Sequence, residues 1–411
     1  MYTDNNMQEY KTGIVDFFNK LVKNQGLKLT IILWCLFGAY FVFYAVMNPG
    51  KHTVTPAYWQ ASLNWINSQN LYTGKGVGFL YLPQSAIMQI PFAIIPFTIA
   101  EPVWRIVNIS LYAFSCYIVA LLCRFTPIKK SFLIISLFSL PLAIDSARNG
   151  QINLTIATLL CITAYTLTHK NYTLSVIVCL IGFALKPYMV VPLLLICGVF
   201  PKRCLTSAVI GVLILFLFPF IFQVPDYVLH QYKEFLNTLE VAHTVAQRKD
   251  FASFFGMLNV FGVNIETSVQ MFCSLILALA TFFYSLYHSI KSPKEESSII
   301  IISIAISFIL LFSSRTENNT YCMIGPFIAY FFLRSIAMQE NLRIINAIIL
   351  ILCYTAMAGS YEVGKLFTPD RAVWLAPLGL TVFICYTLLI IIPRIQRLSL
   401  TSNGTESLKN N

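Results

Sequence analysis

Long apolar runs recur along nearly the whole chain, and they constrain its fold more than any other feature. Water-soluble domains carry about 25% charged residues, whereas only 11% of this chain is charged and 57% is hydrophobic. Inside a bilayer every backbone polar group must be paired within the chain, which permits only helices and closed barrels. The runs are continuous rather than alternating, so they predict an all-α, polytopic membrane helix bundle.

About twelve transmembrane segments are predicted, because roughly 20 apolar residues cross the hydrocarbon core as a helix. Their ranges are 29–49, 103–123, 131–146, 152–169, 172–186, 187–200, 204–223, 266–290, 297–314, 320–339, 343–360 and 374–393. The fifth and sixth are short, and Lys186 and Pro187 lie between them. Since proline ends or kinks a helix, we expect a broken helix that lines a cavity.

The apolar segment 79–99 carries three prolines, Pro83, Pro91 and Pro96. If it crossed the bilayer, every later loop would change sides and the basic loops would face outward. The sequence therefore predicts a re-entrant segment or one that lies at the outer interface.

The net charge of +11 comes mainly from Lys and Arg in short gaps between apolar runs. This distribution orients a membrane protein and argues against a nucleic-acid partner. It places both termini in the cytoplasm, with the basic loops at Arg124, Lys129, Lys130, Lys202, Arg203, Lys291, Lys294, Arg394 and Arg397. Residues 1–28 are predicted to form a cytoplasmic amphipathic segment, 29–393 the membrane module, and 394–411 a disordered cytoplasmic tail.

The eleven cysteines fall inside or at the ends of apolar runs, and no CxxC pair occurs. This pattern is typical of buried apolar side chains rather than of a metal site or a disulfide framework. The chain also has no GxxxxGK[ST], GxGxxG or HExxH motif, so neither a metal nor a cofactor is expected.

Ionisable groups at membrane depth are expensive and mark candidate functional sites. The first cluster comprises Asp145, Arg148, Asn149, Gln151 and Asn153, at the outer end of a helix pair. An arginine here can bind a phosphate through two hydrogen bonds, while the amides bind sugar hydroxyls. The alternative is a helix-connecting turn with a local Asp–Arg ion pair.

The second candidate is Lys186, which can neutralise a phosphate that enters from the bilayer or simply extend to the interface. The third is a polar string in which Glu317 is a candidate general base and Arg315 a second anion ligand, with Asn318 and Asn319 beside them. Its alternative is an ordinary polar turn.

The first outer loop adds His52, Tyr58 and Trp59, and Tyr81 follows shortly after it. Aromatic rings stack on sugars, but they also form the usual belt at a membrane interface. Glu101 lies on an outer connection and is predicted to be a solvated charge. We expect Asp145, Arg148, Lys186, Arg315 and Glu317 to converge on one wet pocket beneath the outer surface.

A series of short motifs carries a resemblance to a known family. In order they are YWQA at 58–61, NLY at 70–72, GFLYLPQS at 78–85, WRIVN at 104–108, NGQIN at 149–153 and GFALKP at 182–187. The series, over roughly residues 50–320, resembles glycosyltransferase family 87, the polyprenol-phosphate-mannose-dependent mannosyltransferases of the GT-C superfamily.

The resemblance implies an inverting enzyme of a prokaryotic inner membrane that moves mannose or another hexose from a polyprenyl-phosphate donor to a lipid or glycan acceptor at the outer face. Such enzymes usually carry a catalytic carboxylate early in the first outer loop, but residues 50–78 contain none. The base is therefore assigned to Glu317 or Asp145, with His52 as a third candidate. The missing carboxylate also leaves open a non-enzymatic protein that binds or translocates a lipid-linked glycan, and a secondary transporter is a further alternative.

Overall fold

The computed structural model describes residues 3–73, 78–245, 251–313, 315–338, 342–368 and 372–397, with side chains from residue 25 onward except 243–245 and 372. Within these ranges every regular element is a helix. The first half contains α1 (Thr3–Met47), α2 (Thr55–Ile66), α3 (Pro83–Met88), α4 (Ile90–Ala93), α5 (Phe97–Leu122), α6 (Ile128–Asn149), α7 (Asn153–Thr168), α8 (Tyr172–Leu185), α9 (Val190–Val199) and α10 (Pro201–Leu217). The second half contains α11 (Pro225–Val245), α12 (Phe254–Val260), α13 (Thr267–Lys291), α14 (Lys294–Phe312), α15 (Gly325–Ala337), α16 (Arg343–Ala358), α17 (Ser360–Phe367) and α18 (Leu375–Tyr386).

Seven helical segments among the described residues are long and apolar enough to cross a membrane. They are Gln25–Met47, Phe97–Leu122, Ile128–Asn149, Pro201–Ile221, Thr267–Lys291, Lys294–Phe312 and Leu375–Arg397. A bent pair, α16 and α17, would be an eighth; its two helices meet at 81°. Four shorter apolar helices remain, namely Asn153–Thr168, Tyr172–Leu185, Pro187–Val199 and Gly325–Ala337. Each range predicted from the sequence overlaps one of these helices.

Helix boundaries differ from the prediction where proline or polar residues intervene. The segment predicted at 103–123 begins earlier, at Phe97, directly after Pro96 at the N-cap, and Pro102 lies inside α5. The segment predicted at 320–339 begins only at Gly325, after a 3₁₀ turn over Asn318–Met323. That turn keeps the polar string out of the regular helix.

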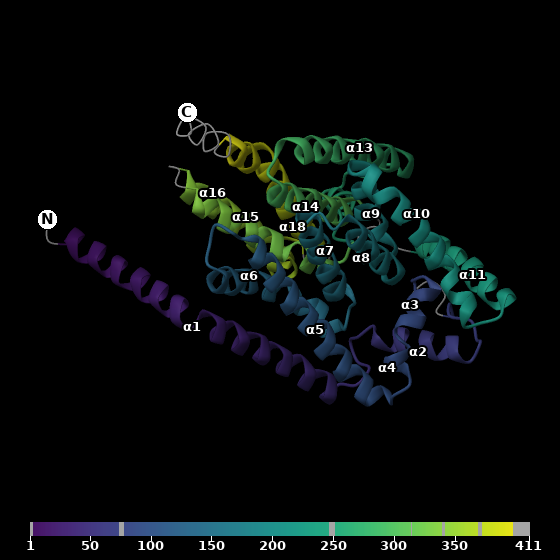
Figure 1. Ribbon diagram of the computed structural model, residues 1–411. Coiled ribbons are helices and arrows are strands. Elements are labelled where there is room, and N and C mark those ends of the chain that lie inside the picture. The colour runs from purple at the N-terminus through teal and green to yellow at the C-terminus, as the bar shows by residue number, and fades with distance from the viewer. Residues whose placement is uncertain are drawn as a thin grey trace.

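The segment 79–99 is not one continuous helix. Pro83 opens α3, Pro91 lies in the first turn of α4, and Pro96 is the N-cap of α5. Each proline starts a new helix, since it lacks the N–H that a helix interior requires. The short helices α2, α3 and α4 gather with α11 at one end of the molecule (Figure 1).

The predicted break at Lys186 and Pro187 is confirmed. Helix α8 ends at Leu185, and Lys186 adopts an extended conformation with φ −145° and ψ 119°. Proline excludes the helical conformation from the residue before it. A 3₁₀ turn over Pro187–Met189 follows, and α9 then begins at Val190.

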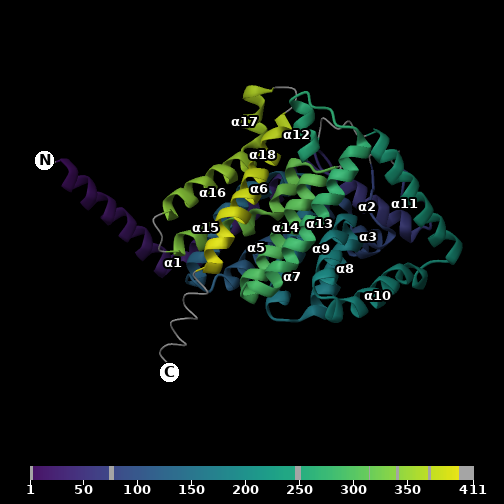
Figure 2. The same ribbon diagram turned by 90° about the horizontal axis from the view of Figure 1, so that it is seen from above.

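Helix α7 forms the centre of the bundle and packs against α5, α8 and α14. It is apolar on nearly all sides and buried over most of its length, as expected for a helix enclosed by others. In Figure 2 the helices α10 and α11 lie at one edge of this bundle and α16 at the opposite edge. Asn153, the first residue of α7, is fully buried.

Ion pairs at one end of the bundle join segments next to the basic loops of the sequence. At one end Arg124 pairs with Glu295 at 2.8 Å, and Arg334 pairs with Glu296 at 2.7 Å. Helix α14 runs from this basic end for 19 residues, or roughly 28 Å at the helical rise. It finishes at Phe312, beside the polar string. The amphipathic pattern predicted for 1–28 falls largely on side chains outside the described residues, as does most of the tail 394–411.

Candidate active site

A polar chamber of about 410 Å³ lies at the end of the bundle opposite the basic loops. Five of the site residues predicted from the sequence line it: Tyr81, Gln151, Lys186, Arg315 and Glu317. Segments far apart in the sequence supply the full lining, which is Leu80, Tyr81, Gln151, Lys186, Pro187, Tyr188, Leu239, Ala242, Ile309, Ser313, Arg315, Thr316, Glu317 and Thr320.

The half-buried Lys186 is aimed into this chamber by the helix break. Its Nζ donates a hydrogen bond of 2.7 Å to Asn153 Oδ1. The ammonium also lies 5.7 Å from the ring centre of Tyr81 and 5.4 Å from that of Tyr188, within the range of a cation–π attraction. The cation is thus held in place without a carboxylate partner among the described residues.

Two buried amides separate Lys186 from Glu317. Asn153 Nδ2 donates to Asn319 Oδ1 at 2.8 Å, and Asn319 Nδ2 donates to Glu317 Oε2 at 2.6 Å. Lys186 lies at one end of this chain of hydrogen bonds and the exposed Glu317 at the other. The amides therefore fix both charged groups while keeping them from neutralising each other directly.

A group of tyrosines closes another wall of the chamber. Tyr58 donates to Gln151 Oε1 at 3.3 Å, and its hydroxyl lies 3.1 Å from that of Tyr81. Tyr72 donates to the Tyr81 carbonyl at 2.7 Å. Burial raises the pKa of Tyr58 well above its ordinary value, so this phenol stays protonated and remains a donor.

Arg315 lies at the edge of the chamber, and its guanidinium stacks 5.6 Å from the ring centre of Phe251. Within the part of the chain that the structure describes, its Nη1 is buried and has no hydrogen-bond partner. The same holds for Oδ1 of the neighbouring Asn318. Buried polar atoms without partners are costly, which makes this corner a candidate for binding a polar or anionic ligand.

The structure places the other predicted site residues outside the chamber. Asp145 and Arg148 form a half-exposed ion pair at 3.0 Å, the local pairing that the sequence left as an alternative. Arg148, His52 and Asn149 line a separate surface hollow. Trp59 donates to the carbonyl of Ile95 at 3.2 Å and lines a third, much smaller hollow. Of the five side chains expected to converge, Lys186, Arg315 and Glu317 meet, whereas Asp145 and Arg148 do not.

The sequence predicted that Glu101 is a solvated charge, and this prediction is wrong. The side chain is buried, and only 1% of its surface is exposed to solvent. It pairs with Arg105 at 2.9 Å. It also accepts hydrogen bonds from Thr55 Oγ1 and from the backbone N–H of Gly50, both at 2.9 Å. Residues 50–78 contain no carboxylate, so the carboxylate that contacts the first loop is Glu101 of α5. The i,i+4 spacing of Glu101 and Arg105 was the signal for this pair.

Arg105 extends this network to the turn between α6 and α7. Its guanidinium donates to Thr53 Oγ1 at 2.9 Å and to the Ala147 carbonyl. Trp104 donates to the carbonyl of Gly150 at 2.9 Å, and Gly150 has a left-handed φ of 63°. This turn leads directly into Gln151 and Asn153. The buried ion pair of Glu101 and Arg105 therefore positions the chamber wall, although neither side chain lines the chamber.

The arrangement suits a displacement reaction in which a hydroxyl loses its proton and an anion departs. The chamber offers a carboxylate to accept the proton and a lysine to neutralise the anion, held apart by amides. Tyrosine hydroxyls and amides beside them are groups that fix the orientation of a polar ligand.

The protein-family model of glycosyltransferase family 87 matches the chain over residues 79–314. The matched range covers more than half of the 411 residues. It includes Tyr81, Gln151 and Lys186 and ends just before Arg315 and Glu317. No curated protein matches the chain.

Proposed function

The chain belongs to glycosyltransferase family 87, and from this premise we propose that it moves a hexose from a polyprenyl-phosphate donor to the hydroxyl of an acceptor bound in the polar chamber. Mannose is the first sugar to test. The observation that carries the proposal is the fixed separation of Lys186 from Glu317 by Asn153 and Asn319.

Glu317 is the proposed general base and Lys186 the proposed phosphate ligand. Glu317 accepts the proton of the acceptor hydroxyl, and the hydroxyl oxygen attacks the anomeric carbon. The bond from that carbon to the phosphate oxygen breaks, and the phosphate leaves with the electron pair. Lys186 stabilises the negative charge that develops on the leaving phosphate. Attack and departure on opposite faces of the sugar invert the anomeric configuration.

The proposed orientation places the chamber at the extracytoplasmic surface of a prokaryotic inner membrane. The basic residues at the opposite end then face the cytoplasm, together with both termini. In the proposed GT-C-like module over 29–393, the four shorter apolar helices and the bent pair also cross the membrane, which with the seven long helices makes twelve segments. The broken segment 79–99 lies at the outer interface in this arrangement.

The proposal is tested by offering purified protein in detergent a radiolabelled polyprenyl-phosphate hexose and a lipid extract that supplies the acceptor. Wild-type protein is expected to transfer the label. Lys186→Ala is expected to lower kcat on the order of 10²–10³, as the loss of one group that stabilises a departing anion does. Arg148→Ala, which removes a cation outside the chamber, is the matched control and should retain activity.

Two outcomes would overturn the proposal. A wild-type protein inert with every polyprenyl-phosphate sugar, yet still able to bind the lipid-linked donor, would indicate a binding or translocating protein. Full activity of Lys186→Ala together with loss in Arg148→Ala would move the phosphate site from the chamber to the surface hollow.

A further inference from the structure

Three cations from separate loops gather at the end of the bundle opposite the polar chamber. Lys170 follows α7, Arg203 lies in the first turn of α10, and Lys294 is the first residue of α14. The ammonium of Lys294 lies within hydrogen-bonding range of that of Lys170, and Arg203 is close enough to repel it as well. All three side chains are exposed. We call these three residues the basic cluster; the reaction proposed above makes no use of it.

The local fold brings these cations together. Lys170 has a left-handed φ of 58°, and its N–H donates to the carbonyl of Leu167 at 2.9 Å, so the chain reverses direction at this residue. Arg203 Nη1 donates to the hydroxyl of Tyr172 at 2.6 Å, and the guanidinium lies 4.8 Å from the centre of the same ring. Tyr172 begins α8 only two residues after Lys170. The turn and the ring therefore hold Arg203 beside the two lysines.

The carboxylates near the basic cluster have other partners. Glu295 attracts Lys294, but it forms an ion pair with Arg124 at 2.8 Å. Its neighbour Glu296 pairs with Arg334 at 2.7 Å. In the part of the chain that the structure describes, no carboxylate forms an ion pair with a member of the basic cluster. Because like charges repel at this separation, the cluster is complementary to an anion that lies between its members.

The backbone adds to the same positive field. Helices α8, α10 and α14 all begin at the basic cluster, so the positive ends of three helix dipoles lie beside the three cationic side chains. Helix N-termini of this kind are well suited to phosphate groups. The chemistry of the cluster therefore favours a phosphate over other anions.

The surface that continues from the basic cluster toward the middle of the bundle is apolar. Leu174 and Ile177 on α8 are 40% and 45% exposed, and Leu205 and Val209 on α10 are 54% and 53% exposed. The two helices pack against each other, and α10 belongs to a segment that is long and apolar enough to cross the membrane. A phosphate that carries hydrocarbon chains matches both parts of this surface, whereas a soluble phosphate matches the cations alone.

We propose that the basic cluster binds the phosphate of an anionic phospholipid whose chains lie along the exposed faces of α8 and α10. Basic sites between membrane helices bind anionic head groups in this way. The orientation proposed above places this lipid in the cytoplasmic leaflet, but its binding does not depend on the transfer reaction.

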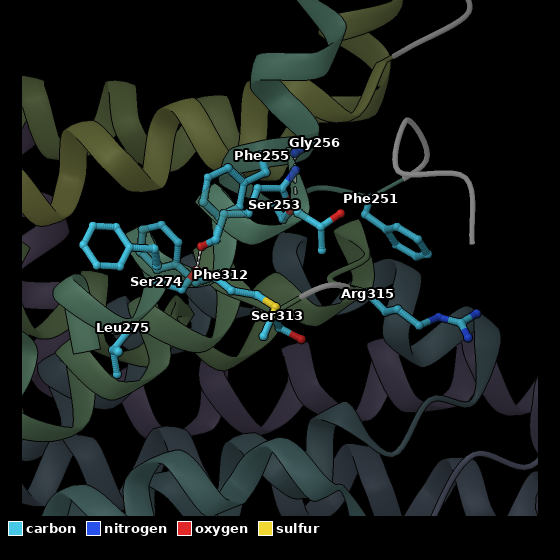
Figure 3. Close-up of a pocket in the computed structure, with 13 residues that line it drawn as sticks. Phe251, Ser253, Phe255, Gly256, Ser274, Leu275, Phe312, Ser313 and Arg315 are labelled. Atoms are coloured by element: carbon cyan, nitrogen blue, oxygen red, sulfur yellow. Dashed lines mark hydrogen bonds between the residues drawn. The ribbon is translucent and has the colours of Figure 1, made fainter. Parts of the chain in front are cut away.

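This lipid is neither the donor nor the acceptor of the proposed reaction. Helix α14 starts in the basic cluster and runs for 19 residues, or roughly 28 Å, to Phe312. Figure 3 shows Phe312, Ser313 and Arg315 at a cavity of about 550 Å³ at that far end. Helix α8 likewise starts in the cluster and ends directly before Lys186. The lipid therefore joins the near ends of two helices whose far ends lead to the chamber, and it should stabilise the fold.

Native mass spectrometry of the purified full-length protein tests the inference without turnover. The protein is titrated with phosphatidylglycerol, with zwitterionic phosphatidylcholine, and with glycerophosphoglycerol, which has the anionic head group but no chains. Wild-type protein is expected to prefer phosphatidylglycerol to both. Lys170→Gln combined with Lys294→Gln should weaken phosphatidylglycerol binding by about 25-fold, since each cation contributes a factor of about five, and should leave phosphatidylcholine binding unchanged.

The matched control is Lys129→Gln combined with Lys130→Gln, which removes the same charge from the start of α6 at the same end of the bundle. It should keep the wild-type preference for phosphatidylglycerol. Thermal melting separates binding from folding. Without phosphatidylglycerol, Lys294→Gln should melt at or above the wild-type temperature, because one of two touching like charges is gone. Added phosphatidylglycerol should raise the melting temperature of the wild type more than that of this variant.

Three results would overturn the inference. Equal affinity of wild-type protein for phosphatidylglycerol and phosphatidylcholine would show that the cluster does not select an anionic lipid. Equal losses in the cluster variant and in the α6 control would assign the preference to the overall charge of this end. Binding of glycerophosphoglycerol as tight as that of phosphatidylglycerol would make the ligand a soluble phosphate. Each result leaves the sugar-transfer assay unaffected, so the proposed function is tested separately.

Discussion

Two pairs of oppositely charged residues lie at the same end of the bundle, and they differ in burial and in whether the two charges touch. Glu101 and Arg105 are buried and in direct contact at 2.9 Å. Lys186 and Glu317 are held apart by two amides and line a cavity. A carboxylate whose oxygens all have donors inside the protein has little left for a substrate. The separated pair keeps both charges available to a ligand that enters the cavity.

The largest effect is expected from Glu317→Gln. If Glu317 is the base, kcat should fall on the order of 10²–10⁴, because an amide cannot take the proton. Gln retains an oxygen that accepts from Asn319 Nδ2, so the melting temperature should change little. A transfer assay with radiolabelled donor, run beside thermal melting, measures both.

The matched control for this variant is Glu266→Gln, which changes an exposed carboxylate at the start of α13. It should leave both activity and melting unchanged. If the Glu317→Gln enzyme keeps the wild-type kcat, Glu317 is not the base, and the two charge pairs do not differ in function as proposed.

The next largest effect is expected from Glu101→Ala, and it should appear in stability. Removing one partner of a buried ion pair costs about 3–5 kcal/mol, because the remaining charge stays buried and unpaired. The free energy of unfolding, measured by denaturant titration in mixed micelles, should fall by about that amount. The double variant Glu101→Leu with Arg105→Met should recover part of the loss.

Glu101→Gln gives the sharper comparison, because Glu101 reaches the part of the first loop where related enzymes usually carry a catalytic carboxylate. Gln keeps one acceptor oxygen for Thr55 and Arg105. The folded variant should retain kcat within about tenfold of wild type, far above the loss typical of a missing base. Normal stability combined with a much lower kcat would instead make Glu101 the base.

The sequence predicted those parts of the site that depend on local chemistry. The break at Lys186 follows from proline alone, and the structure confirms it. The helical nature of the chain follows from continuous apolar runs. The polar string at Arg315 and Glu317 was identified because such residues are costly next to membrane segments.

Parts that depend on packing between distant segments were not predictable in this way. Glu101 and Asp145 both follow or end apolar stretches, yet one is enclosed and the other half-exposed. What separates them is whether another segment folds over the side chain, as the loop with Gly50 and Thr55 does over Glu101. Similarly, Asn153 and Asn319 meet across 166 residues of sequence, and no local pattern indicates which amides pair.

Gly150→Ala should produce an intermediate effect that links the two charge pairs. A Cβ at this position would lie 2.8 Å from Cζ of Arg105, and the φ of 63° is unfavourable for alanine. Because the guanidinium is fixed by Glu101, Thr53 and the Ala147 carbonyl, it cannot simply rotate away. We expect a loss of about 1–3 kcal/mol in unfolding free energy and a smaller drop in kcat, since the turn carries Gln151 into the chamber.

A matched control for Gly150→Ala is Gly262→Ala, which also has a left-handed φ, of 82°, but meets no atom within 4 Å. It should show the backbone penalty alone and leave kcat unchanged. Equal losses of stability in both variants would show that Arg105 does not hold the turn.

The smallest effects are expected from Asp145→Asn and Arg148→Ala, which remove the third pair of opposite charges at this end. Their side chains are 39% and 49% exposed, and ion pairs in such surroundings contribute about 0–1 kcal/mol. Neither side chain lines the polar chamber, so kcat and KM for the donor should stay within about twofold of wild type, as for surface substitutions elsewhere. The measurement is the same transfer assay, run at low and high salt because exposed pairs are screened. A large loss of kcat in Asp145→Asn alone would give this carboxylate the role of base, and it would require the α6–α7 turn to move toward the chamber when substrate binds.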